Sequence, residues 1–166
     1  MSVETLVSVE QYLNSCYDPD VEYVDGTLVE RNVGDWLHSL VQSNLIYWLR
    51  HRYPDLKVVP EFRSQTAPTR FRLPDVTVLL APPRTRYLMD AAFIAIEILS
   101  EDDRMTGVLE KLAEYEAKGV PNIWVIDPRL EQIFVFRSGS LALIQDDILR
   151  TADAAVELRR AEIFQS

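Results

Sequence analysis

The segment Leu73-Pro74-Asp75-Val76-Thr77-Val78-Leu79-Leu80 is followed, after a loop rich in proline and arginine, by Phe93-Ile94-Ala95-Ile96-Glu97-Ile98-Leu99-Ser100. Both runs are nearly continuously apolar and rich in β-branched residues, which is typical of strands buried on both faces of a sheet. Each run contains one carboxylate, and a buried carboxylate is costly unless it is paired, hydrogen-bonded or bound to a metal. The two segments therefore predict neighbouring buried strands that carry a candidate metal site at Asp75 and Glu97.

A helix over residues 104–118 follows the second run directly. Its apolar positions recur at spacings of three and four, and Gly119 is a suitable C-terminal cap. At about 100° per residue, Lys111 lies on the flank of the apolar stripe, beside Tyr115. A lysine in that position can extend its stem along the sheet and bring its ammonium group to a strand carboxylate. The alternative is a solvated lysine or an i,i+3 partner of Glu114.

The rest of the chain alternates helical and extended patterns. The expected elements are a helix over 8–15, a hairpin around Asp25-Gly26, a helix over 35–52, and strands at 57–62, 122–126, 131–136, 141–145 and near 147–151. Residues 63–72 are expected to form a polar connection, and residues 158–164 a terminal turn. This order indicates an α/β domain with a mixed central sheet packed by helices. A right-handed crossover through the 104–118 helix makes the strand at 122–126 parallel to the strand at 93–99.

Composition and charge limit the number of domains and the classes of function that we expect. The chain has 166 residues, of which 48% are hydrophobic, and we expect one domain over residues 1–166. The net charge of -9 argues against a general polyanion-binding protein. The segment from Arg63 to Arg86 nevertheless carries five arginines against Asp75 alone. These arginines either lie on solvated loops or form a rim that contacts phosphates.

The hydropathy, the N-terminal residues and the cysteine content of the sequence all indicate the same compartment. No apolar run approaches the roughly 20 residues of a membrane helix. Residues 1–5 contain no basic segment of a signal peptide. The single Cys16 excludes an internal disulfide framework and a cysteine-rich zinc site, and we expect it to be at least half-buried. A cytoplasmic protein is the simplest interpretation.

Several motifs in this order and spacing resemble the Uma-two family, described as "putative restriction endonucleases", of the PD-(D/E)XK nuclease-like superfamily. The matching segments are Pro74-Asp75, Glu97-Ile98-Leu99-Ser100, Lys111 with Tyr115, Gly119-Val120, Trp124-Val125-Ile126-Asp127-Pro128, the hairpin Glu22–Gly26 and the helix carrying His38. The resemblance covers nearly the whole chain. It implies a restriction endonuclease-like fold, a mixed sheet flanked by helices with an N-terminal helix and β-hairpin.

The resemblance also implies an activity, the hydrolysis of DNA phosphodiester bonds with Mg²⁺ or Mn²⁺. Asp75 matches the first acid and Glu97 the second, and both are expected to bind the metal. The third residue of the superfamily motif falls on Leu99, so the lysine is expected from the following helix, at Lys111. Glu22 is a further candidate acid. A homodimer is expected by analogy, because cutting two strands often needs two sites.

The chemistry assigns further roles. Mg²⁺ prefers oxygen ligands and keeps several waters, so the carbonyl of Ile98 is a candidate third ligand. Lys111 would position or deprotonate the attacking water, or stabilise developing charge. Arg72 and Arg104 are expected to hold the substrate backbone.

Each candidate also has a structural interpretation. Asp75 alone would be a strand-entry residue bonded to the backbone, and Glu22 an exposed hairpin residue. We expect His38 to be a packing residue rather than a base or ligand. Tyr115 is expected in the core or bonded to Lys111, and Trp36, Trp48 and Trp124 in the core or an interface. For the whole chain the alternatives are a catalytically decayed nucleic-acid-binding or regulatory module, and a hydrolase of a smaller phosphate substrate.

Overall fold

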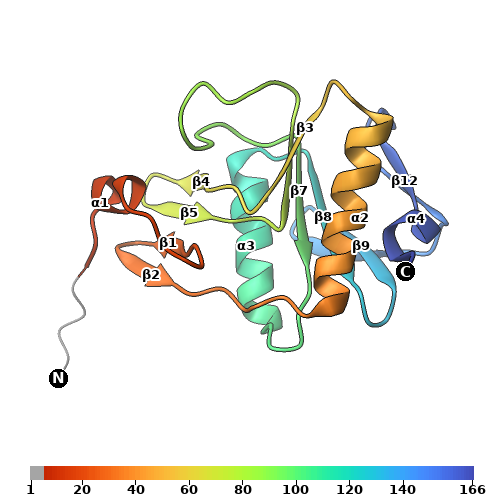
Figure 1. Cartoon of the computed structure of the whole chain (residues 1–166), viewed down its shortest axis with the longest axis horizontal. Helices are drawn as coiled ribbons and strands as arrows, with labels where there is room; N and C mark the ends of the chain where they lie inside the picture. Colours follow the sequence, from red (N-terminus) through yellow and green to blue (C-terminus); the bar gives the residue numbers. More distant parts are fainter. Residues whose placement is uncertain (1–5) are drawn as a thin grey trace.

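A six-stranded mixed sheet forms the centre of the computed structural model, which describes residues 6–166 (Figure 1). The strand order is β10-β9-β8-β7-β6-β3, and only β7 and β8 run parallel among neighbours. The strands are β3 (Lys57–Pro60), β6 (Val76–Leu79), β7 (Ile94–Ile98), β8 (Asn122–Asp127), β9 (Gln132–Arg137) and β10 (Ser140–Ile144). The predicted mixed sheet and its parallel crossover are confirmed, and Pro60 lies on an edge strand, where its missing N–H costs no ladder bond.

Two long helices cover opposite faces of this sheet, which Figure 1 shows nearly edge-on between them. They are α2 (Trp36–Arg52) and α3 (Met105–Lys118). Alternate residues of β7 point to opposite faces, so Ile96 packs in the cluster with α2 while Ala95 packs with α3. By the same alternation Glu97 faces α3, the helix that carries Lys111.

Both helices have the expected ends. The Asp35 carboxylate caps α2 by accepting a hydrogen bond from the N–H of His38. Gly119 ends α3 in the left-handed conformation, with φ of 99°, which glycine adopts without the steric cost of a side chain.

A second, smaller sheet lies beside the first and has the order β2-β1-β5-β4. Its strands are β1 (Glu22–Val24), β2 (Thr27–Val29), β4 (Ser64–Ala67) and β5 (Arg70–Arg72), and α1 (Val9–Asn14) packs against it. The predicted Asp25-Gly26 hairpin is confirmed, with positive φ at both residues. The prediction of an irregular connection over 63–72 was wrong, because β4 and β5 form a hairpin there. Their short, polar strands lack the apolar alternation by which a strand is recognised.

The C-terminal segment packs against α2. It contains β11 (Ile148–Arg150), β12 (Glu157–Arg159) and α4 (Arg160–Phe164). The terminal turn predicted over 158–164 is thus a strand followed by a short helix. The side-chain amide of Asn44 fixes this helix by donating to the carbonyls of Ile163 and Gln165, at 3.0 and 2.8 Å.

The expectation about Cys16 is wrong, and the tryptophans differ in burial. Cys16 is exposed rather than half-buried. Trp36 lies at the start of α2 with 76% of its surface exposed, whereas Trp124 is fully buried in the core. None of the helices within residues 6–166 combines the length and apolar character of a membrane crossing. The expectation about residues 1–5 lies outside the described residues.

The arginines between positions 63 and 86 do not form one phosphate-contacting rim. Arg63 is buried, contacts Asp20 through two hydrogen bonds of 2.8 and 2.6 Å, and stacks over the ring of Tyr12 at 4.3 Å. Arg70 pairs with Asp25 at 2.7 Å. Arg63 therefore fastens α1 to the small sheet, a structural role that neither predicted alternative included.

Replacing Arg63 with methionine is expected to lower the free energy of unfolding by about 2–4 kcal/mol, because Asp20 and two backbone carbonyls lose their partner. Urea denaturation at pH 7 measures this loss. The matched control is Arg84→Met at an exposed loop position, which should change the free energy by less than about 0.5 kcal/mol. Equal effects of the two variants would contradict the structural role.

Candidate functional site

Asp75 and Glu97 lie opposite each other at the end of two central strands. Val76 pairs with Ile96 in the antiparallel ladder of β6 and β7, and continuing this register by one residue places Asp75 opposite Glu97. Asp75 is 3% exposed, and its Oδ2 accepts a hydrogen bond of 2.7 Å from the N–H of Ile98. Pairing of the strands thus brings the two predicted acids together, and the structural interpretation of Asp75 is also correct in part.

Glu97 is a carboxylate in an apolar strand, and its contacts compensate only in part for the burial of its charge. The Tyr115 hydroxyl donates to its Oε1 at 2.5 Å, and Lys111 Nζ lies 3.8 Å from its Oε2. Burial raises the pKa of Glu97 to about 7, and the charge of Lys111 opposes this shift only in part. Tyr115 therefore bonds to Glu97, rather than to Lys111 as one interpretation of the sequence proposed.

Lys111 joins the two sheets through a second carboxylate. Its Nζ lies 3.0 Å from Oε1 of Glu22, which is 1% exposed on β1. Burial alone would lower the pKa of Lys111, but the charges of Glu97 and Glu22 raise it above its ordinary value, so the side chain stays protonated. The interpretation of Glu22 as an exposed hairpin residue is wrong, and so is the alternative interpretation of Lys111 as a partner of Glu114.

Arg72 is buried in the same ion-pair network. Its Nη1 lies 3.0 Å from Glu22 and its Nη2 2.7 Å from Glu114. Arg70 shares Glu114, at 2.7 Å. These pairs hold the end of β5 against α3, so the guanidinium of Arg72 is already engaged by protein carboxylates. Arg104 is exposed where α3 begins, and it lines the pocket described below.

Two basic side chains that did not enter the predicted site also contact Asp75 and line the same pocket. Arg31 Nη2 donates to Asp75 Oδ1 at 2.8 Å, and His38 Nε2 lies 3.3 Å from the same oxygen. Burial would lower the pKa of His38, but its hydrogen bond with Asp75 raises it above the ordinary value. His38 is buried, as expected of a packing residue, yet it faces the acid. Arg31 lies in a segment without periodicity, where no sequence pattern indicates its direction.

These groups line one pocket of about 560 Å³. Seven acidic and four lysine or arginine side chains line it: Glu22, Glu30, Asp75, Glu97, Asp102, Asp103 and Glu110, with Arg31, Arg72, Arg104 and Lys111. All seven predicted site residues, including Ile98, therefore line the same cavity. Its surplus of negative charge favours a cation over a bare polyanion.

The donor set fits a hard divalent cation, although it is not assembled around one point. Within residues 6–166, no three His, Cys, Asp or Glu side chains form a ready metal-binding group. Mg²⁺ needs only one or two carboxylates, however, because it retains several waters. Asp75 and Glu97 could supply these oxygens, and the two buried carboxylates would gain a counter-charge from the ion. Arg31 and His38 contact the Asp75 oxygen that the ion would need.

Replacing Glu97 with glutamine is expected to change the pH dependence of stability. As pH rises from about 4.5 to about 7, the free energy of unfolding of the wild type should fall by about 1–3 kcal/mol relative to that of the variant. The reason is that the folded wild type must ionise a buried acid whose pKa is raised. Urea denaturation with a chelator present measures this difference. In the comparison with Glu114→Gln, the matched control, the wild type should show no such loss between pH 4.5 and 7 and should instead lose stability relative to the variant below about pH 4.5, since its arginine partners lower the pKa of Glu114. Parallel profiles for wild type and Glu97→Gln would contradict the assignment.

Comparisons with known proteins agree with this architecture. A crystal structure described as a "putative nuclease belonging to DUF820" from Anabaena variabilis superimposes with a TM-score of 0.80 at 20% identity, covering 95% of this chain and 97% of that chain. This match confirms the restriction endonuclease-like fold. No curated protein matches the sequence. Residues 9–160 match the family model Uma2, described as "Putative restriction endonuclease". The chain therefore belongs to the Uma2 family.

Proposed function

We propose that this chain is a divalent-metal-dependent endonuclease that hydrolyses phosphodiester bonds in DNA. The observation that carries the proposal is the convergence of Asp75, Glu97 and Lys111, from three different elements, on one pocket. Membership of the Uma2 family and the description of the solved structure support a nuclease. We further propose that the chain acts in the cytoplasm as one domain and pairs as a homodimer to cut both strands.

The carboxylates would hold Mg²⁺ or Mn²⁺. Asp75 and Glu97 are the proposed ligands, with the carbonyl of Ile98 at the end of β7 as a third and Glu22 as a further acid. When bound, the ion would activate a water and stabilise charge on the phosphate oxygens. Tyr115 orients Glu97 by donating to its Oε1, which leaves Oε2 turned toward Lys111 and the pocket.

Lys111 is the proposed catalytic cation. Because Glu22 and Glu97 keep it protonated, it can donate hydrogen bonds to the attacking water or to a phosphate oxygen. The same two contacts fix its direction, which compensates for the absence of a lysine at position 99. Glu22 is thus proposed to act on Lys111 as well as on the metal.

Arg104 is the better placed of the two predicted substrate-binding arginines. It is exposed at the pocket mouth, whereas Arg72 contacts Glu22 and Glu114. Arg72 would reach a phosphate only by giving up one of these partners. We therefore propose that Arg104 contacts the substrate backbone directly, and that Arg72 contributes mainly by positioning Glu22.

The variants Asp75→Asn and Glu97→Gln test the proposal without changing side-chain size. Both should lose Mn²⁺ binding in calorimetry, and cleavage of plasmid DNA should fall at least about 100-fold, because each removes a metal ligand. Asp55→Asn, at an exposed acid outside the pocket, should behave as wild type. If the wild type stays folded but neither binds Mn²⁺ nor cuts DNA, the alternative of a non-catalytic binding or regulatory module replaces the nuclease.

The variant Lys111→Met separates catalysis from metal binding. Turnover should fall about 10²–10⁴-fold, because the cation that assists the water is lost. Mn²⁺ affinity should be retained or increase, since the variant removes a positive charge beside the ligands. Single-turnover cleavage and calorimetry on the same samples measure the two effects. A loss of Mn²⁺ binding with folding intact would show that Lys111 only organises the carboxylates.

A further inference from the structure

Arg31 occupies the side of Asp75 that faces the pocket. Its Nη2 lies 2.8 Å from Asp75 Oδ1, and its Nη1 lies 3.5 Å from Glu61, a half-exposed acid at the outer edge. Within residues 6–166, the bond to Asp75 is the only hydrogen bond that Arg31 donates. Because a guanidinium has five N–H donors, most of its hydrogen-bonding capacity remains available at the pocket wall.

The contact with Asp75 must change when that carboxylate holds a metal. A divalent ion bound through Oδ1 would share that oxygen with Arg31, and two cations on one carboxylate oxygen repel each other. Oδ2 is not a simple substitute, because it accepts the N–H of Ile98 within the sheet. Metal binding therefore favours displacement of Arg31 from Asp75.

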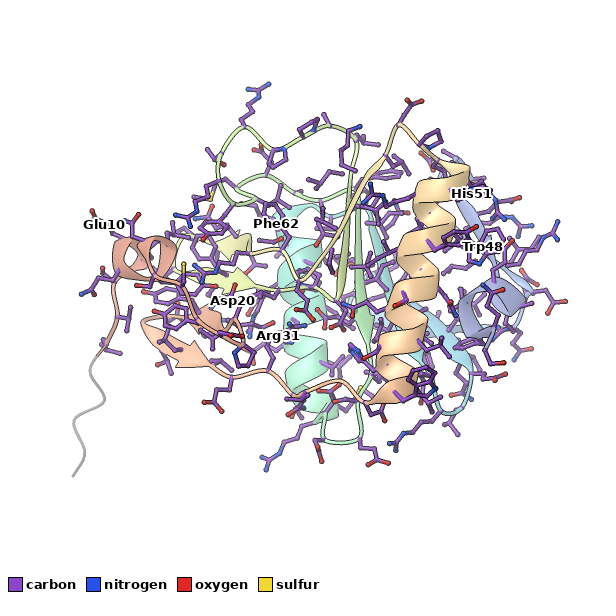
Figure 2. The ribbon with its side chains drawn as sticks, viewed as in Figure 1. Glu10, Asp20, Arg31, Trp48, His51 and Phe62 are labelled. Atoms are coloured by element: carbon purple, nitrogen blue, oxygen red, sulfur yellow. The ribbon has the colours of Figure 1, made fainter. Side chains whose placement is uncertain are left out.

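The backbone around Arg31 is suited to such a displacement. Residues 30–35 form neither helix nor strand and link β2 to α2. Figure 2 labels Arg31 near the centre of the view, and 16% of its side-chain surface is exposed. The linker is held by Asn32, whose amide donates to Asp103 at 2.8 Å, so the displaced side chain would stay at the pocket.

We propose that Arg31 is a substrate-binding residue that exchanges partners. It pairs with Asp75 until a divalent cation takes the carboxylate, and it then binds a phosphate of the DNA backbone. A guanidinium matches phosphate geometry with two parallel hydrogen bonds, as it does a carboxylate. This inference rests on the proposed nuclease function and adds a residue to its substrate site.

The exchange predicts effects of opposite sign for one variant. In Arg31→Met, Mn²⁺ alone should bind about tenfold more tightly in calorimetry, because a competing cation is removed. Fluorescein-labelled duplex DNA, with Ca²⁺ present to prevent turnover, should bind about tenfold more weakly, because a phosphate contact is lost. Arg31→Lys should bind Mn²⁺ as weakly as the wild type does, because it retains the positive charge. Its DNA affinity should lie between those of Arg31→Met and the wild type, because lysine lacks the planar fork of the guanidinium.

The control is Arg52→Met, which removes an arginine paired with Glu162 outside the pocket and should change neither affinity. If Arg31→Met is unstable in thermal denaturation, Arg31→Lys provides the Mn²⁺ and DNA comparison. Weaker or unchanged Mn²⁺ binding, or unchanged DNA binding, would overturn the exchange while the proposed function stands. If the wild type binds neither Mn²⁺ nor DNA, the proposed function is wrong and the exchange falls with it.

Discussion

Three carboxylates buried around one pocket require positive charge beside them, and this requirement connects the whole structure. Glu22, Asp75 and Glu97 are each at most 7% exposed, which is tolerated only when buried charges have partners. The partners come from distant segments: Arg72 from β5, Lys111 from α3 and Arg31 from the linker before α2. Each of these ion pairs joins two elements, so the charge balance of the pocket also holds the small sheet, the central sheet and α3 together.

The positive charges do not fully compensate the buried carboxylates, and the incompletely compensated carboxylate is Glu97, where the chemistry is expected. The pKa of Glu97 remains raised to about 7 although Lys111 is nearby, which means that the site would gain from another positive charge. A divalent cation supplies that charge and would also offset the acidic mouth of the pocket. This explains how an acidic protein could act on a polyanion: under our proposal, the site becomes attractive to DNA only after a metal is bound, so metal and substrate binding should be coupled.

The small sheet positions Glu22 and Arg72 at the pocket. Glu22 reaches the pocket because β1 pairs with β5, and continuing the observed register places Glu22 opposite Arg72. Glu114 then holds Arg72 and Arg70 against α3, and Thr66 of β4 donates to the same carboxylate at 2.8 Å. A lysine on a helix has four flexible bonds, and these contacts limit where its ammonium group lies. Under our proposal, the helix supplies the lysine that the superfamily motif usually takes from the strand.

The sequence by itself determined the central strands, the two long helices and the hairpin at Asp25-Gly26, and it indicated Asp75, Glu97 and Lys111 as candidate site residues. These follow from local physics: apolar runs with single acids, helical periodicity, caps, and a turn that needs positive φ. Only the tertiary structure decided the contacts of Arg31, Arg72, His38 and Glu22, because ion pairs between residues tens of positions apart leave no periodic pattern. It also decided that β4 and β5 form within residues 63–72, since β5 pairs with β1 and β4 pairs with β5, whereas their own composition does not indicate strands.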